Sequence, residues 1–516
     1  MGKFIRYFKD HTEIFFLVFV TLVSVLSFTF FFREGVTTIY GDSKGHLNIT
    51  RRVVDSPTPG ASQLGAYWLP FLHILTLPFI GSNYLWHTGI AGTIPNMVSY
   101  IVTALFLYKL LLLLTKKKFT ALILSSLYFL NPNILFMQTT PMTEIVFVMT
   151  FVTGSYYFIL WSYKKELYQL IVSAVFILLS SITRYEGWGV VAFSSFILMF
   201  EVFRHKFSKK SEANFLIFSG LAWYGIFLWI VWGAIIVHDP LDFMRNSFSA
   251  KSQTVLYYSN LKATGDHNVP LAVATNIMAA THTSGYVLVS LFCVSFIYFI
   301  IKKNFKLFQL KNLAPMILLM PFLFDILTVY TGNVPVEVPE LSRQMSPGNL
   351  FNVRYSIFLI PAMVAYLALL TKNKYAQTVF VVAVLVSYAF LVSPNYRNLV
   401  TLSESGASGV NHQMKSDLSW LRRNYDGGYI LASDGAADGF MFESGFNLKN
   451  FISEGSYRLW DMSLEHPENV VRWVILDEGN LRDAVNKKIN KRNLHKYFKP
   501  ALKDNTFTIY KRNYSL

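Results

Sequence analysis

Charged residues are scarce in this 516-residue chain, and cysteine is nearly absent. Asp, Glu, Lys and Arg make up 15% of the residues, whereas soluble globular domains have about a quarter. Hydrophobic residues reach 53% and aromatic residues 16%, so the composition indicates a polytopic membrane protein. The lone cysteine, Cys293, lies within an apolar run. It therefore provides no disulfide framework and no information about the redox compartment.

Acids are fewer than bases, which gives a formal net charge of +16. The bases stand in short clusters between apolar runs: Lys3/Arg6/Lys9, Lys116 to Lys118, Lys164/Lys165, Arg204/Lys206/Lys209/Lys210, Lys302/Lys303/Lys306/Lys311 and Lys372/Lys374. Such clusters beside membrane spans mark cytoplasmic ends and attract anionic lipid. We therefore interpret the charge as a signal of membrane topology and do not expect a nucleic-acid partner.

We predict about eleven membrane-spanning helices, because a span needs about 17–25 mostly apolar residues. They cover residues 13–32, 87–113, 119–136, 142–162, 167–183, 187–203, 215–237, 286–301, 313–331, 354–371 and 376–392. With the N-terminus in the cytoplasm, every basic cluster falls on the cytoplasmic side. The first run has no small-residue cleavage site, which favours a retained span. The stretch 65–81 contains Pro70, His73 and Pro78, and we expect an amphipathic helix at the outer surface.

An odd number of spans places the C-terminus outside the cell. Residues 393–516 have normal polarity, with predicted helices at 414–423 and 480–489 and predicted strands at 429–433, 470–476 and 506–511. The predicted fold class is therefore mostly α. A transmembrane helical module, 1–392, with its first outer loop at 33–86, precedes a small extracytoplasmic α/β domain at 393–516.

Common nucleotide and hydrolase motifs are missing from the sequence. It has no P-loop, dinucleotide fingerprint, HExxH zinc motif or GxSxG elbow, which argues against a soluble-nucleotide enzyme. It also has no internal repeat, and many secondary transporters carry one.

Two acids lie at predicted outer helix ends. Asp42 follows the first span, and His46, four residues later, would share its helix face and could point into the same cleft. Alternatively, Asp42 only caps a helix and His46 is solvated. Glu144 lies at the outer entry of the fourth span, where the helix dipole alone would favour an acid and Thr140 or Thr143 could cap the helix.

Basic residues also occur on the outer side, where the positive-inside pattern does not expect them. Arg184 lies between the fifth and sixth spans, and Arg354, followed by Tyr355, opens the tenth. A guanidinium suits a phosphate, although Arg184 could instead pair with Glu186. Lys251, in the outer loop 239–285, and Arg343, in the loop before the tenth span, add charge to the same side.

These features resemble the GT-C superfamily of integral-membrane glycosyltransferases. The shared features are an acid in the first outer loop, a surface helix after it, a second acid at an outer helix end and an outer soluble tail. The chain is most similar to the polyprenyl/dolichyl-phosphate mannosyltransferase and aminoarabinose-transferase branch, over roughly residues 1–392. The resemblance implies that Asp42 and Glu144 are the catalytic acids. Arg184 matches a basic position, and Arg354-Tyr355 an Arg-Tyr pair at a late span.

Two departures from the family pattern leave the acceptor and the metal requirement open. Asp42 is followed by Ser43 where the family usually has another acid, and His46 matches no family position. His46, Tyr355, Arg343 and Lys251 remain candidates for contacting a substrate or a divalent metal ion.

The sequence thus predicts an inverting glycosyltransferase of the plasma membrane and cell envelope. It would move a sugar from a polyprenyl-phosphate-linked donor to an extracytoplasmic glycan, lipid or protein. Asp42 would be the base, Glu144 would position the acceptor or help bind a metal, and the two arginines would hold the phosphate. The alternatives are a membrane transporter or lipid flippase, for which Asp325 is the one clear mid-span acid, and a non-catalytic scaffold.

Overall fold

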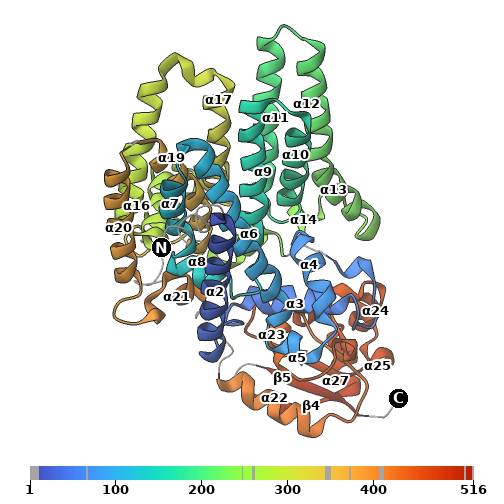
Figure 1. Cartoon of the computed structure of the whole chain (residues 1–516). Coiled ribbons are helices and arrows are strands. Elements are labelled where there is room, and N and C mark those ends of the chain that lie inside the picture. Colours follow the sequence, from blue (N-terminus) through green and yellow to red (C-terminus); the bar gives the residue numbers. More distant parts are fainter. Residues whose placement is uncertain are drawn as a thin grey trace.

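The computed structural model describes residues 11–64, 68–246, 248–258, 262–342, 350–370, 373–405, 412–504 and 507–513. A long helical bundle carries a smaller domain of helices and strands at one end (Figure 1). The predicted fold class is therefore confirmed, with a mostly α module followed by a C-terminal α/β domain.

Nine helical segments of the described chain are long and apolar enough to cross a membrane. They are α2 (Thr12–Arg33), α6 (Ile90–Thr115), α9 (Glu144–Lys164), α11 (Glu186–Arg204), α12 and α13 (Lys209–Ala222 and Tyr224–Ile236), α16 (Val269–Lys303), α17 to α18 (Leu310–Tyr330), η4 with α19 (Val353–Leu359 and Ile360–Leu370), and α20 (Lys374–Leu391). The other two predicted spans coincide with shorter apolar helices, α7 (Lys118–Phe129) and α10 (Leu167–Ser181). The protein is a multi-pass membrane protein.

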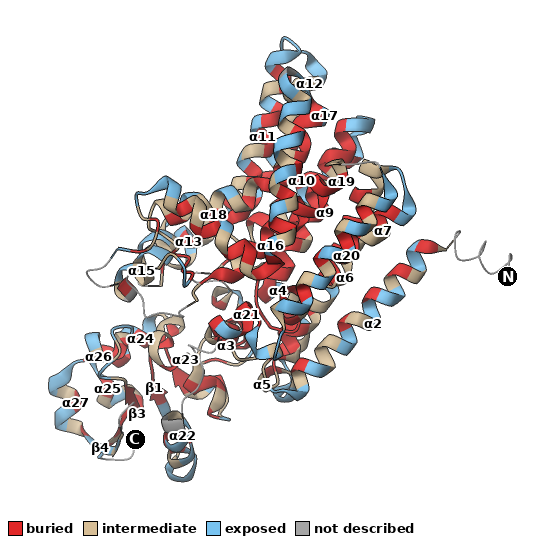
Figure 2. Ribbon diagram, turned by 90° about the vertical axis from the view of Figure 1, so that its left-hand side faces the viewer, coloured by how far each residue is buried: buried red, intermediate tan, exposed pale blue. Residues whose placement is uncertain are grey.

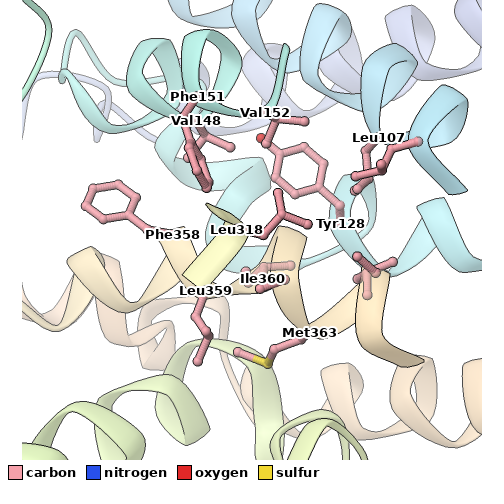
Figure 3. Packing of buried hydrophobic residues seen from close by; sticks show 14 of the residues in the cluster. Leu107, Tyr128, Val148, Phe151, Val152, Leu318, Phe358, Leu359, Ile360 and Met363 are labelled. Atoms are coloured by element: carbon pink, nitrogen blue, oxygen red, sulfur yellow. The ribbon is translucent and has the colours of Figure 1, made fainter. Parts of the chain in front are cut away.

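Large apolar side chains fill the centre of the bundle. Phe151 of α9, Tyr128 of α7, Leu318 of η3 (Ala314–Leu319), Phe358 of η4 and Met363 of α19 belong to one buried cluster and converge in Figure 3. Other large apolar side chains point outward, notably along α2, which lies at the edge of the bundle (Figure 2). A protein that is apolar both inside and outside suits a lipid environment.

Among its described residues, the long connection between α2 and α6, predicted to lie outside the cell, contains four helical pieces: α3 (Gly41–Arg52), η1 (Ala61–Gln63), α4 (Phe71–Ile80) and α5 (Asn83–His87). Helix α4 falls where a surface helix was expected over 65–81, although residues 65–67 are outside the described residues. Leu72, His73, Thr76 and Ile80 are buried, and α4 packs against α3 and α6. Its depth relative to a bilayer stays a prediction.

The C-terminal domain contains a five-stranded mixed sheet in the order β2-β1-β3-β5-β4. Strands β2 (Phe451–Ile452), β1 (Tyr429–Leu431) and β3 (Val471–Leu476) are parallel, whereas β5 (Thr508–Arg512) runs antiparallel to β3 and to β4 (Phe498–Lys503). Its helices are α22 (His412–Asn424), α23 (Asp434–Glu443), α24 (Arg458–Glu465), α25 (Pro467–Val470), α26 (Ala484–Lys488) and α27 (Lys491–Tyr497). Helix α21 (Val400–Ser405) lies in the connector from α20.

Four predicted elements agree with the structure to within a few residues. The predicted strands 429–433, 470–476 and 506–511 correspond to β1, β3 and β5, and the predicted helix 414–423 corresponds to α22. The helix predicted over 480–489 is wrong in length. The Asp483 side chain accepts a hydrogen bond from the Asn486 backbone NH, 2.8 Å, and so starts α26 only at Ala484. Strands β2 and β4 were not predicted, because β2 has two residues and β4 is mostly exposed.

Helix α3 joins the two parts of the molecule through polar contacts with α23, which we call the α3–α23 ladder. Lys44 pairs with Glu443 at 3.0 Å, Asn48 Nδ2 donates to Asp438 Oδ1 at 2.6 Å, and Arg52 Nη1 donates to Asp434 at 2.6 Å. The three α3 residues are spaced four apart and so share one helix face. Residues 43–52 are all buried although the helix is polar, because neighbours enclose it.

Candidate active site

One guanidinium group lies at the centre of the candidate site. Arg354, near the start of η4, donates from Nε to Glu144 at 3.0 Å, from Nη1 to Glu404 at 3.0 Å and from Nη2 to Asp42 at 3.1 Å. The three carboxylates come from α9, α21 and α3. Each nitrogen of the group therefore holds a carboxylate from a different part of the chain.

A second arginine shares one of these carboxylates. Arg184 Nη1 donates to the same Glu144 oxygen at 3.2 Å and to Thr143 Oγ1 at 2.8 Å, and its Nη2 donates to Glu186 at 2.7 Å. Burial opposes the charged form of Arg184, but the carboxylates of Glu186 and Glu144 outweigh it and raise the pKa of the guanidinium. The local Arg184–Glu186 pair is therefore present alongside the contact with Glu144.

The ring of Tyr355 lies against both arginines. Its centroid is 4.4 Å from the Arg184 guanidinium carbon and 4.9 Å from that of Arg354. Tyr40 covers Arg354 from a distance of 5.2 Å. Cations are attracted to aromatic faces, most strongly where water is excluded. The two rings therefore help to hold the guanidinium planes in position.

Glu404 was not predicted as a site residue. Its Oε1 accepts from Arg354 and from the Tyr40 hydroxyl, 3.1 Å away, and its Oε2 accepts from the Val353 backbone NH at 2.7 Å. Burial raises the pKa of Glu404, although Arg354 opposes this shift. Sequence reasoning gave no signal for it, because an acid in a polar connector between two domains is unremarkable until the fold places it.

Asp42 differs from its companions in accessibility. Its side chain is 47% exposed, whereas those of Glu144 and Glu404 are 0% and 1% exposed. The N-cap of α3 is Tyr40, so the alternative in which Asp42 merely caps the helix is wrong. At Glu144, the Thr143 hydroxyl accepts from Arg184 and makes no capping hydrogen bond. Glu144 does lie in the first turn of α9, where the helix dipole also favours an acid.

His46 is buried, so the alternative of a solvated His46 is wrong. Its Nδ1 lies 3.0 Å from His73 Nε2, and its ring packs against the Trp68 ring, with centroids 4.1 Å apart and planes tilted by 37°. Burial is the main cause that lowers the pKa of His46 to about 3, and the charges of Arg184 and Arg354 add to it. Among the described residues, the side-chain hydrogen bond of His46 joins it to His73 and not to the Asp42 carboxylate.

The two remaining candidates do not join the cluster. Lys251 is exposed on α15 (Ala250–Tyr258) and forms none of the site hydrogen bonds found among the described residues. Arg343 lies outside the described residues.

A divalent ion does not fit this arrangement. Within the described part of the chain, no three His, Cys, Asp or Glu side chains are grouped closely enough to hold a metal ion. The Arg354 guanidinium lies between the carboxylates of Asp42, Glu144 and Glu404 and already donates to each. We therefore assign no step of the reaction to a metal ion.

Similar solved structures identify the architecture. No family model matches the sequence, and no curated protein matches it significantly. ArnT from Cupriavidus metallidurans bound to undecaprenyl phosphate is 10% identical, with 96% of this chain and 97% of that chain covered and a TM-score of 0.54. The Archaeoglobus fulgidus oligosaccharyltransferase, tethered to an acceptor peptide with the NVT sequon, is 12% identical, with 92% and 70% covered and a TM-score of 0.52.

The chain has a GT-C fold. Apo ArnT from the same bacterium matches as well, at 10% identity with 97% and 98% of the two chains covered and a TM-score of 0.51. The fold that the resemblance implied is confirmed. The GT-C likeness extends through the C-terminal domain, beyond the 1–392 range expected from the sequence.

Proposed function

We propose that this GT-C protein transfers a sugar from a polyprenyl-phosphate-linked donor to an extracytoplasmic acceptor, with inversion at the anomeric carbon. One observation carries the proposal. An accessible carboxylate, Asp42, contacts the same guanidinium as two buried carboxylates, and α3, which carries Asp42, packs against α23 of the C-terminal domain. This arrangement offers a base to an acceptor and cations to a phosphate leaving group.

Asp42 is the proposed general base. It would take a proton from an acceptor hydroxyl or amine as that group attacks the anomeric carbon. The bond from this carbon to the phosphate oxygen breaks, and the lipid phosphate leaves with the electron pair. Arg354 and Arg184 would stabilise the negative charge that develops there. Attack from the face opposite the phosphate inverts the anomeric configuration.

Glu144 has a different proposed role from Asp42. Its side chain is fully buried, and one of its oxygens accepts from both arginines. Its other oxygen is buried without a hydrogen-bond partner among the described residues. We therefore propose that Glu144 positions the arginines and does not touch the acceptor.

The proposed membrane orientation has the N-terminus in the cytoplasm and the C-terminal domain outside, at the plasma membrane. The basic connections between α11 and α12 and between α16 and α17 lie at the end of the bundle opposite the C-terminal domain (Figure 1). Cytoplasmic loops are enriched in Lys and Arg, so this separation supports the orientation.

A membrane-embedded lipid donor suits this orientation. The matched ArnT structure holds undecaprenyl phosphate, and a second Archaeoglobus oligosaccharyltransferase structure, of AglB at a TM-score of 0.50, holds dolichol phosphate and an inhibitory peptide. For this chain we propose a polyprenyl-phosphate sugar as donor and a glycan, lipid or protein as acceptor.

A transporter or flippase is less well supported. Such a protein needs ionisable groups along a path through the membrane. Asp325, the mid-span acid, is buried within electrostatic range of Glu186 and Arg184 and so belongs with the cluster already described.

An assay in proteoliposomes distinguishes sugar transfer from lipid transport. Purified protein is reconstituted with polyprenyl-phosphate donors carrying different radiolabelled sugars, together with an extract of cell-envelope acceptors. The proposal expects one donor to be consumed and its label to appear on an acceptor. Movement of intact labelled lipid between leaflets, with no donor consumed, would contradict it.

A further inference from the structure

We propose that the donor phosphate displaces Asp42 from Arg354, so that donor binding itself frees the catalytic base. This inference rests on the proposed function. It addresses how Arg354 can bind a phosphate when all three of its nitrogens already donate to carboxylates.

The three carboxylates on Arg354 are held with unequal strength. Glu144 also accepts from Arg184, and Glu404 also accepts from Tyr40 and from the Val353 backbone NH. For the Asp42 carboxylate, the contact with Arg354 Nη2 is the one hydrogen bond found among the described residues. Asp42 is thus the least restrained of the three.

Solvent exposure also sets Asp42 apart from the other two carboxylates. A ligand arriving from the outer face can reach the 47% exposed side chain of Asp42, whereas those of Glu144 and Glu404 are 0% and 1% exposed. Displacing either buried acid would leave a carboxylate without its cation inside the protein, which is costly. The exposed Asp42 can return to water. An incoming phosphate therefore replaces Asp42 at Nη2.

The exchange would change the chemistry of Asp42. While Asp42 contacts Arg354, its Oδ2 is occupied as a hydrogen-bond acceptor; once it leaves, both carboxylate oxygens are open to an acceptor hydroxyl or amine. The base becomes fully competent only when a leaving group occupies the site.

The test measures the affinity of purified full-length protein for polyprenyl phosphate without a sugar, at a pH of about 8. If Asp42 competes with phosphate for Arg354, Asp42→Asn and Asp42→Ala should both bind this lipid more tightly. The expected gain is about fivefold, the upper end of what an exposed ion pair contributes. Two substitutions are used because the asparagine amide oxygen can still accept a hydrogen bond from Arg354.

Glu443→Gln is the matched control. Glu443 is 40% exposed and pairs with Lys44 of α3 at 3.0 Å, so the variant also removes an accessible carboxylate that contacts a cation. It does not touch Arg354, and its affinity should equal that of the wild type. Equal or weaker binding by both Asp42 variants would overturn the exchange and leave the proposed function intact. Failure of the wild-type protein and every variant to bind polyprenyl phosphate would overturn both.

Discussion

Arg184 and Arg354 donate hydrogen bonds to the same oxygen of Glu144, at 3.2 Å and 3.0 Å. Two guanidinium groups can lie this close because a carboxylate lies between them. The arginines lie near the starts of two separate helices, α11 and η4, so Glu144 sets their relative placement. The candidate site is therefore a network of ion pairs whose members depend on one another.

Replacing Asp42 by asparagine should abolish most sugar transfer while the protein still folds. The substitution keeps the shape of the side chain and removes the base, and loss of a general base typically costs about 10²–10⁴-fold in rate. Transfer from a labelled donor is measured beside the thermal unfolding midpoint of the same preparation. A folded variant that transfers sugar at the wild-type rate would show that Asp42 is not the base.

Lysine should not replace arginine at position 354 or 184. One ammonium cannot reproduce the three-way contact of Arg354 with Asp42, Glu144 and Glu404. Each lost charge-assisted hydrogen bond is worth roughly 1.5–3 kcal/mol, so apparent donor affinity should fall about ten- to a hundredfold. Initial rates are compared across donor concentrations. Unchanged donor dependence in Arg354→Lys and Arg184→Lys would exclude phosphate binding by these arginines.

Removing the Arg52–Asp434 pair of the α3–α23 ladder should lower the stability of the C-terminal domain. Arg52→Met leaves the Asp434 carboxylate, whose side chain is 5% exposed, without its 2.6 Å cation partner. Removing one member of a buried pair costs about 3–5 kcal/mol. Limited proteolysis of the 412–504 region should therefore accelerate. The double variant Arg52→Met/Asp434→Leu should recover part of the loss, and additive effects of the two changes would argue against direct coupling.

The stability of the C-terminal domain against unfolding should fall as pH rises. Burial, reinforced by Asp434, raises the pKa of Asp438 to about 7 from 3.8 and that of Glu454 to about 8 from 4.5. Folding thus favours the protonated acids. Their contribution to stability is complete below a pH of about 4 and is lost as pH rises through about 7 and 8. The unfolding midpoint should fall over that window, and less so in Asp438→Asn. A midpoint that rises over this window would contradict the assignment.

The membrane orientation can be tested with single cysteines in a Cys293→Ser background. Ser208, exposed within the basic connection before α12, should react only with a reagent that reaches the cytoplasm. Ser419, exposed on α22, should react with an impermeant thiol reagent added outside. Ser419 is preferred to Ser433, which is buried and donates to Glu454. The reverse labelling pattern would invert the topology and remove the site from the outer face.

Much of this protein could be predicted because the decisive signals are local. A membrane span shows as a run of apolar residues, and Asp42, Glu144, Arg184 and Arg354 each stand out as a charge at a helix end. Glu404 and Tyr40 could not be found this way, because their roles exist only where distant segments meet. The same reason explains why the contacts of His46 were not predicted: its partners, His73 and Trp68, come from another part of the connection between α2 and α6.

The α3–α23 ladder also sets the order in which the protein can mature. Lys44 and Glu443, its first pair, are separated by roughly 400 residues. A ribosome that adds about 5–20 residues per second needs about 20–80 s to make this stretch. For most of that interval the nascent chain already holds Asp42 but lacks Glu404, and α23 is complete only at its end. The candidate site therefore has all its members only after Glu404, which follows the membrane helices in the chain, has been made. A chain that stalls or is cut before α21 would lack Glu404 and so one of the three carboxylates on Arg354.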